Sequence, residues 1–221
     1  MHSLSLQNQT LILYPEGAIF WQKQKALLIS DLHLGKSAVF RARGIPVPEG
    51  SDPYDLERLT TLLKKTRPQK LIILGDLFHA KESASAPTIM NFSNWKKEHN
   101  RLEIMLIEGN HDRSCRDLPV KWNIELMKNS FSIEPFLLSH QPQNQIGLYN
   151  IAGHIHPSIK VKDRGHRTTR IPCFYFGEQS ALLPSFGSFT GHYTIQPEPN
   201  SQIFGIVDNQ ILHLPQKVWF S

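Results

Sequence analysis

The stretch "ALLISDLH" (Ala26–His33) changes character in its middle. Ala26–Ser30 is a short and almost wholly apolar run, which is typical of a strand buried on both faces. Asp31 and His33 follow directly, although a hydrophobic core has no use for either residue. Ligands of open α/β sheets bind beyond the carboxyl ends of the strands. The stretch therefore predicts a buried strand that delivers two polar side chains to a site.

Four further apolar runs end in the same way, with Asp, Asn or His soon after a predicted strand. These stretches are "LIILGD" (Leu71–Asp76), "IMLIEGNHD" (Ile104–Asp112), "FLLSH" (Phe136–His140) and "YNIAGHIH" (Tyr149–His156). Parallel strands place their carboxyl ends at one edge of a sheet, so we expect these polar side chains to gather there.

Helices are predicted between the first three of these strands. An apolar stripe indicates one helix between Asp52, which can cap its start, and Pro68, which ends it. A second helix is predicted from Pro87 to about His99, whereas Gly35–Gly50 is predicted to be irregular. Strands that alternate with helices indicate parallel βαβ units.

Short strands account for the rest of the chain. Thr10–Tyr14 and Ala18–Trp21 are predicted to form a hairpin. The later predicted strands are Ile124–Met127, Phe136–Ser139, Tyr149–Ala152, Ile171–Phe176, Ile203–Val207 and Ile211–Leu214. No repeat or linker divides the chain. We therefore predict one α/β domain over residues 1–221, a single-domain α/β/β/α sandwich of two packed mixed sheets flanked by helices.

The composition narrows the class of protein. The 221 residues are 40% hydrophobic, with a net charge of +5, which suits a buried core and permits an anionic ligand or nucleic acid. Cys115 and Cys173 are the only cysteines, too few for a disulfide scaffold. The first residues lack the features of a signal peptide, and no apolar run is long enough to span a membrane. We expect a cytoplasmic protein without membrane contact.

The polar residues at the strand ends form a set of metal donors. They are Asp31, His33, Asp76, Asn110, His140, His154 and His156. Oxygen and imidazole donors without thiolate suit manganese, iron or zinc better than magnesium or calcium. Seven donors exceed the needs of one ion and match two divalent ions that share a carboxylate. We expect two such ions, with manganese first and iron or zinc as alternatives.

Each motif also has an ordinary structural interpretation. An Asp after a strand is often a helix cap or a turn residue, and short motifs match by chance. The joint order is more specific. Asp-x-His, Gly-Asp, Gly-Asn-His-Asp, a strand-terminal His and Gly-His-x-His follow one another over residues 31–156. This order resembles the calcineurin-like metallophosphoesterase superfamily.

Finer matches resemble the ligase-associated branch of that superfamily. They are "SDLHLGK", "FRARGIPVP", "LGDLFHA", "EGNHDR", "AGHIHP" and "LPSFGSFTGH". Members of that branch are described as DNA damage response endonucleases or phosphoesterases, encoded near an ATP-dependent DNA ligase and a DEXH-box helicase. Two positions depart from the superfamily pattern: His79 replaces an acid or amide, and Ser139 precedes His140 where Gly is common. His79 could face the substrate, lie behind the ligands or be structural.

The resemblance implies a division of the donors between two metals. Asp31, His33 and His156 would bind the first ion, and Asp76 would bridge both. The second ion would be held by Asn110, His140 and His154. In an extended chain His154 and His156 would point to the same side and straddle the ion pair. Gly153 would allow close approach of the backbone, and Pro157 would end the strand.

The resemblance also implies a reaction. A metal-bridging hydroxide would attack phosphorus in line, and His111 would act as general acid toward the leaving oxygen. Asp112 could orient the His111 ring and keep it protonated. The expected function is a two-metal phosphodiesterase acting on DNA, a nuclease linked to DNA repair. Two alternatives stay open: a phosphoesterase for small phosphodiesters or nucleotide monoesters, and a metal-bound protein scaffold without catalysis.

Basic residues near the motifs are candidates for substrate binding. They are Lys36, Arg41, Arg43 and Arg113. Arg can clamp phosphate oxygens with two hydrogen bonds, although each of these residues could equally be a solvated surface charge. The segment Lys160–Arg170 carries five Lys or Arg in eleven residues. It could follow a nucleic-acid backbone or be a solvated hairpin.

Overall fold

The first half of the chain forms one mixed sheet. The structure is a computed structural model that describes residues 1–48, 50–83, 85–114, 118–162, 168–216 and 219. Within these residues, strands β1 to β7 pair in chain order. They are β1 (His2–Leu6), β2 (Gln9–Tyr14), β3 (Ala18–Trp21), β4 (Ala26–Ile29), β5 (Lys70–Ile73), β6 (Glu103–Ile107) and β7 (Ile124–Met127). The pairs from β1 to β4 are antiparallel, and those from β4 to β7 are parallel, as the predicted βαβ units require.

The second half forms a sheet in which some neighbouring strands are not consecutive in the sequence. Its order is β14-β11-β12-β13-β10-β9-β8, with β15 on β12 and β16 on β15. The strands are β8 (Ser130–Ile133), β9 (Phe136–Ser139), β10 (Tyr149–Ala152), β11 (Pro157–Lys162), β12 (Thr168–Phe176), β13 (Ser180–Leu182), β14 (Tyr193–Thr194), β15 (Gln202–Val207) and β16 (Gln210–Leu214). Pro157 begins β11 and does not end a strand, because the first position of a strand tolerates a residue without an N–H.

The described α-helices are α1 (Lys36–Ala42), α2 (Ser51–Thr66) and α3 (Ala86–Glu98). The prediction that Gly35–Gly50 is irregular was wrong in part, because α1 occupies seven of its residues. The predicted cap was also wrong. Helix α2 begins after Gly50, and the Asp52 carboxylate accepts hydrogen bonds from the Gly35 N–H and the Thr88 hydroxyl. Asp52 thus joins the starts of all three helices.

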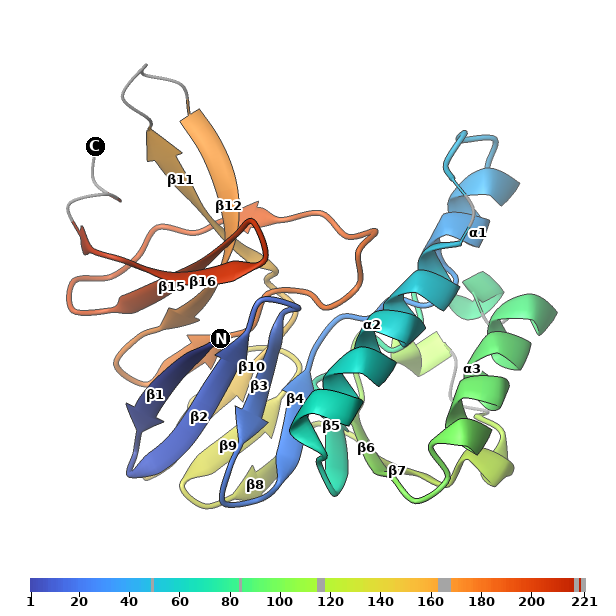
Figure 1. Cartoon of the computed structure of the whole chain (residues 1–221), viewed down its shortest axis with the longest axis horizontal. Helices are drawn as coiled ribbons and strands as arrows, with labels where there is room; N and C mark the ends of the chain where they lie inside the picture. Colours follow the sequence, from blue (N-terminus) through green and yellow to red (C-terminus); the bar gives the residue numbers. More distant parts are fainter. Residues whose placement is uncertain (49, 84, 115–117, 163–167, 217–218, 220–221) are drawn as a thin grey trace.

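The two sheets pack face to face over a shared core, as Figure 1 shows. Successive residues of the central strands point to opposite faces. Leu27 and Leu71 face the helices, whereas Leu28 and Ile72 face Phe136 on the second sheet. These alternating sides confirm a sandwich of two packed mixed sheets. Helices α2 and α3 cover the outer side of the first sheet.

Among the described residues, no helix is both long and apolar enough to cross a membrane.

Candidate metal centre

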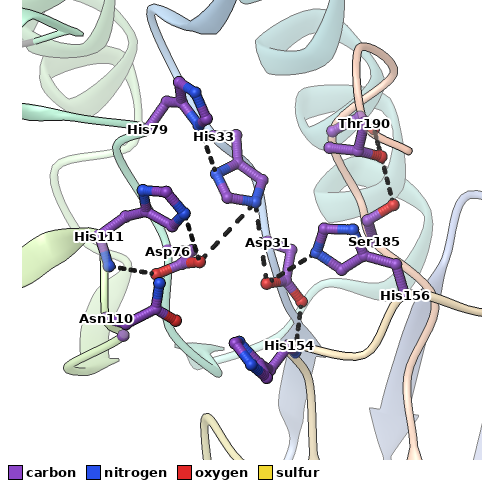
Figure 2. A network of polar contacts seen from close by, with 12 residues as sticks. Asp31, His33, Asp76, His79, Asn110, His111, His154, His156, Ser185 and Thr190 are labelled. Carbon is purple, nitrogen blue, oxygen red and sulfur yellow. Dashed lines mark hydrogen bonds and ion pairs between the residues drawn. The ribbon is translucent and has the colours of Figure 1, made fainter. Parts of the chain in front are cut away.

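The carboxyl ends of five strands meet at one point and bring the predicted donors together. Donor atoms of Asp31, His33 and His156 lie within 4.8 Å of one another. Asp76, His140 and His154 form a second such group. His33, His79 and His111 form a third such group. Figure 2 shows His33 above Asp76 and Asp31, with the His156 ring beside Asp31 and His154 below it.

Residues with left-handed backbone at the strand ends direct the donor side chains toward one another. Positive φ angles occur at Asp31 (55°), His33 (49°), Asp76 (53°), His154 (65°) and His156 (50°). Such angles are uncommon outside glycine and carry strain that clusters at functional sites. The expectation that His154 and His156 lie on an extended chain was therefore wrong. Each histidine is aimed by its own turn and not by strand alternation.

Asp31 is the buried acidic donor of the first group. Its carboxylate is fully buried, and Oδ2 accepts a hydrogen bond of 2.9 Å from the His154 N–H. Oδ1 lies 3.1 Å from His156 Nε2 and 3.9 Å from His33 Nε2, yet it has no hydrogen bond to the described residues. Burial opposes ionisation, but the three neighbouring imidazoles hold the pKa of Asp31 below its usual value. A bound cation would satisfy this buried oxygen.

The second group brings three possible metal donors into contact. His140 Nδ1 lies 2.9 Å from the Leu74 carbonyl oxygen, which accepts a hydrogen bond when this nitrogen carries the ring proton. His140 Nε2 lies 2.9 Å from Asn110 Oδ1 and 3.0 Å from His154 Nδ1. A carbonyl hydrogen bond that fixes the tautomer of a ligating histidine is a recurrent feature of metal sites. The donor set therefore fits a metal ion.

Asp76 belongs to the second group and also lies close to His33 of the first group. Its Oδ2 is 3.8 Å from His33 Nε2 and 3.5 Å from His140 Nε2, which is the position that a shared ligand requires. Burial and the nearby charge of Asp31 raise the pKa of Asp76 to about 7. Burial lowers the pKa of His33 to about 2, which keeps its imidazole neutral, as metal binding requires. Two adjacent buried carboxylates favour the presence of cations.

His79 also belongs to the site, a role that the sequence left open. Its Nδ1 lies 3.4 Å from His33 Nδ1, so a His33 ring that offers Nε2 to a metal can donate its other N–H to His79. The His79 ring stacks on His111, with centroids 4.9 Å apart. Burial, together with the charges of Lys36, His111 and Arg43, lowers the pKa of His79 to about 4. The signal available in the sequence was its place in the Gly-Asp motif.

His111 and Asp112 have different surroundings. The partly exposed His111 ring places Nε2 at 4.0 Å from Asp76 Oδ2, and its backbone N–H donates to Asp76 Oδ1. Asp112 is buried and accepts backbone N–H bonds from Asp76, Gly109 and Phe78 at 2.7, 3.0 and 3.2 Å. The expected contact of Asp112 with the His111 ring stays a prediction. The backbone hydrogen bonds give Asp112 a positioning role, because they tie together two of the loops that carry donors.

Glycines let these loops approach one another. A Cβ on Gly153 would lie 2.7 Å from Asp31 Oδ2, and one on Gly109 would lie 2.1 Å from Asp76 Oδ1. Both distances are below any real contact. The predicted close approach at Gly153 is therefore confirmed.

The four predicted substrate-binding residues have different surroundings in the structure. Lys36 is half-buried, and the charges of Asp31 and Asp76 act on its ammonium group. Arg43 is exposed, and its charge contributes to the lowered pKa of His79. The other two have neighbours outside the donor set. Arg41 donates to the Pro48 carbonyl oxygen at 3.1 Å, and Arg113 lies 4.0 Å from Glu108. Lys36 is thus close to two donors, and Arg43 is close to His79.

The basic segment Lys160–Arg170 is only partly described. Lys160 and Lys162 lie on β11, and Arg170 lies on β12. Residues 163–167, which include His166, lie outside the described residues, as does Cys115.

Comparisons with known proteins agree with this geometry. A family model described as calcineurin-like phosphoesterase matches residues 25–214. No curated protein matches the chain. The crystal structure of nuclease MPE from Pseudomonas putida is similar, with a TM-score of 0.85 and 35% identity over 96% of this chain and 99% of that chain.

Two other solved structures are more distant. A protein of unknown function from Aquifex aeolicus has 21% identity and a TM-score of 0.43, covering 59% of this chain and 78% of its own. The phosphoesterase Yfce from E. coli has 15% identity and a TM-score of 0.42, covering 86% of this chain and 97% of its own.

Proposed function

This chain belongs to the calcineurin-like phosphoesterase family, and we propose that it is a two-metal phosphodiesterase that cleaves DNA. The observation that carries the proposal is the position of Asp76 Oδ2 between two groups of donors, 3.8 Å from His33 Nε2 and 3.5 Å from His140 Nε2. A carboxylate shared between two ions is the feature that phosphatases and nucleases use to hold a metal pair.

The proposed ligands divide as the geometry groups them. Asp31, His33 and His156 hold one ion. His140, His154 and Asn110 hold the other, and Asp76 serves both. The imidazole-rich donor set favours manganese, with iron or zinc as alternatives. Two such ions, when bound, supply a nucleophile at neutral pH and stabilise the charge that develops on the phosphoryl oxygens.

His111 is the proposed general acid. It follows the proposed ligand Asn110, and its partly exposed ring faces Asp76 Oδ2 at 4.0 Å. From this position it can hold a proton at Nε2 and give it to the oxygen that leaves phosphorus. His79 stacks on the same ring and restricts its orientation. Lys36, beside both carboxylates, is placed to attract a phosphodiester.

DNA is the proposed substrate. The support is a 35% identical relative whose structure is described as a nuclease, together with the net charge of +5. The sequence resemblance to the ligase-associated branch supports a role in DNA repair beside an ATP-dependent DNA ligase and a DEXH-box helicase.

A substrate panel with manganese tests the proposal. It contains bis-p-nitrophenyl phosphate, p-nitrophenyl phosphate, cyclic nucleotides, and single- and double-stranded DNA. We expect cleavage of the diester and of at least one form of DNA. Cleavage of the monoester alone would overturn the nuclease assignment. A fully metallated sample that cleaves nothing would favour the scaffold alternative.

A further inference from the structure

Strands β11 and β12 form a ribbon that starts at the metal centre. β11 begins at Pro157, directly after His156, and pairs antiparallel with the first half of β12. Figure 1 shows this ribbon and α1 projecting on opposite sides of the molecule. Helix α1 likewise begins three residues after His33. Two projections therefore leave the metal centre in different directions.

One face of the ribbon is basic. Lys160 and Lys162 are two residues apart and point to the same side, and Arg170 pairs in register with Lys160 across the ribbon. All three side chains are exposed. Lys160, Lys162 and Arg170 form no ion pair with a carboxylate in the described part of the chain, unlike Arg58, Lys70 and Arg113. No described carboxylate thus balances this face.

The opposite face of the ribbon is apolar and anchored. Ile159, Val161 and Ile171 pack into a hydrophobic cluster with Cys173 and Leu214. Because side chains alternate along each strand, this burial forces Lys160, Lys162 and Arg170 outward. The basic face is therefore fixed by packing and does not depend on flexible side chains finding a common direction.

The cross-strand pair of Lys160 and Arg170 is unfavourable for the stability of the ribbon. Like charges placed directly opposite across an antiparallel pair destabilise a sheet. Neutral or oppositely charged residues at the same exposed positions would stabilise the ribbon better. A polyanion that lies along the face would convert this repulsion into attraction.

We propose that Lys160, Lys162 and Arg170 hold the phosphate backbone of a DNA strand that extends from the metal centre along the ribbon. At about 3.3 Å per residue, Lys160 and Lys162 lie roughly 13 and 20 Å along the strand from His156. Phosphates of one strand of B-form DNA recur about every 3.4 Å along the axis. The contacts therefore fall roughly four to six nucleotides from the cleaved bond. This inference rests on the proposed function.

The test compares two triple variants on DNA oligonucleotides of 2 to 20 nucleotides with manganese. One variant is K160Q/K162Q/R170Q. The matched control, K23Q/K64Q/K97Q, removes three exposed lysines from the turn before β4 and from the last turns of α2 and α3. These positions lie at the opposite edge of the first sheet from the metal centre. The measurements are KM, its salt dependence, and turnover of bis-p-nitrophenyl phosphate.

For the ribbon variant we expect the KM of the 20-mer to rise roughly ten-fold, because three phosphate contacts are lost. The slope of log KM against log salt should fall by about 2, since each contact contributes roughly 0.7 to 0.9. The dinucleotide and bis-p-nitrophenyl phosphate cannot reach the ribbon, so their turnover should be unchanged. The control variant should match the wild type throughout.

Stability provides a second readout. Removing the like-charged pair should leave the Tm of the ribbon variant unchanged or higher. If the triple variant fails to fold, Lys162→Gln alone carries the test, because its cross-strand partner is the neutral Thr168. For that variant we expect a KM rise of roughly two- to three-fold.

Two outcomes would overturn the inference, and they differ from each other. Wild-type protein that cleaves bis-p-nitrophenyl phosphate but no DNA would remove the proposed function together with the inference. Wild-type protein that cleaves DNA, with equal KM and salt slope in both triple variants, would overturn the inference and leave the proposed function intact.

Discussion

Asp76 is the residue on which both donor groups depend. Its two oxygens have separate tasks: Oδ1 accepts the His111 backbone N–H, and Oδ2 faces His33 and His140. One side chain thereby connects the His111 loop with the two groups. The sequence showed Asp76 as a strand-end acid, but its central position depends on contacts between strands far apart in the chain.

Replacing Asp76 with Ala should remove metal from both groups and abolish phosphodiester cleavage. Loss of an outer partner of a metal ligand costs 10- to 100-fold in affinity, so loss of a shared ligand should cost more than roughly 100-fold. Manganese content after dialysis and turnover of bis-p-nitrophenyl phosphate are the measurements. Glu57→Ala, on the exposed side of α2, is the control. Wild-type turnover in Asp76→Ala would refute the bridging role.

The pKa of Asp76 predicts how the metal-free protein responds to pH. Its pKa is raised to about 7 when folded and is near 4 in an unfolded chain, so the folded state binds more protons between these values. The contribution of Asp76 to stability is therefore present at pH 4 and is lost as the pH rises toward 7. In urea unfolding with a chelator, Asp76→Asn should gain stability over the wild type progressively across this window. A difference independent of pH would contradict the prediction.

His111→Ala should separate acid catalysis from metal binding. A general acid contributes typically 10²- to 10⁴-fold, so DNA cleavage should fall by roughly 100-fold or more. Hydrolysis of bis-p-nitrophenyl phosphate should fall much less, because nitrophenolate leaves without a proton. The variant should retain wild-type manganese content, measured by elemental analysis. Loss of the metals would instead assign His111 to the metal site.

At the scale of elements, Asp112 connects two loops through hydrogen bonds from their backbone N–H groups. The loop after β5 supplies the Asp76 and Phe78 N–H groups, and the loop after β6 supplies that of Gly109. Hydrogen bonds to charged groups contribute about 1.5–3 kcal/mol each, with losses that do not simply add.

Asp112→Ala should therefore lower the free energy of unfolding by about 3 kcal/mol or more, measured in urea with the metals removed. A change below about 1 kcal/mol, together with a loss of activity confined to substrates with poor leaving groups, would instead favour the orienting role predicted from the sequence. Glu125→Ala, exposed on β7, is the matched control.

Sequence patterns predicted best the elements that have a clear apolar pattern. The apolar stripe of α2 and the runs of β4, β5 and β6 agree with the predicted positions within a few residues. Helix α1 has only seven residues, too few to show a helical period. Strand β11 was missed because Pro157 looks like an end signal, whereas proline also suits a strand's first position.

At the scale of the whole molecule, the strand ends that carry the candidate donors were predictable, and the order of the strands was not. The rule that ligands lie beyond strand ends directed attention to these positions. The order of the second sheet, in which β12 pairs with β11, β13 and β15, depends on contacts across the chain. No local pattern specifies that order. The contact between His79 and His33 has the same origin, because 46 residues separate them.

Metal binding should stabilise the whole chain. At free manganese about 1,000 times its Kd, binding to the folded state contributes roughly 4 kcal/mol per site. For a chain of this length this corresponds to a Tm rise of about 10 °C for each site. Calorimetry with manganese or with a chelator measures the shift, and Asp76→Ala should lose most of it. Equal Tm values for the wild type in both conditions would count against a metal site in the fold.

The left-handed backbone at Asp31, His33, Asp76, His154 and His156 matters for anyone who wishes to transplant this centre. Copying the seven side chains onto another sheet would leave them aimed by ordinary strand alternation, along directions that do not converge. The turns would have to be copied too, with Gly109 and Gly153 beside them, because a Cβ at either glycine would collide with a donor carboxylate. The transferable unit is a set of five strand ends with their backbone conformations, and the side chains are the easier part to move.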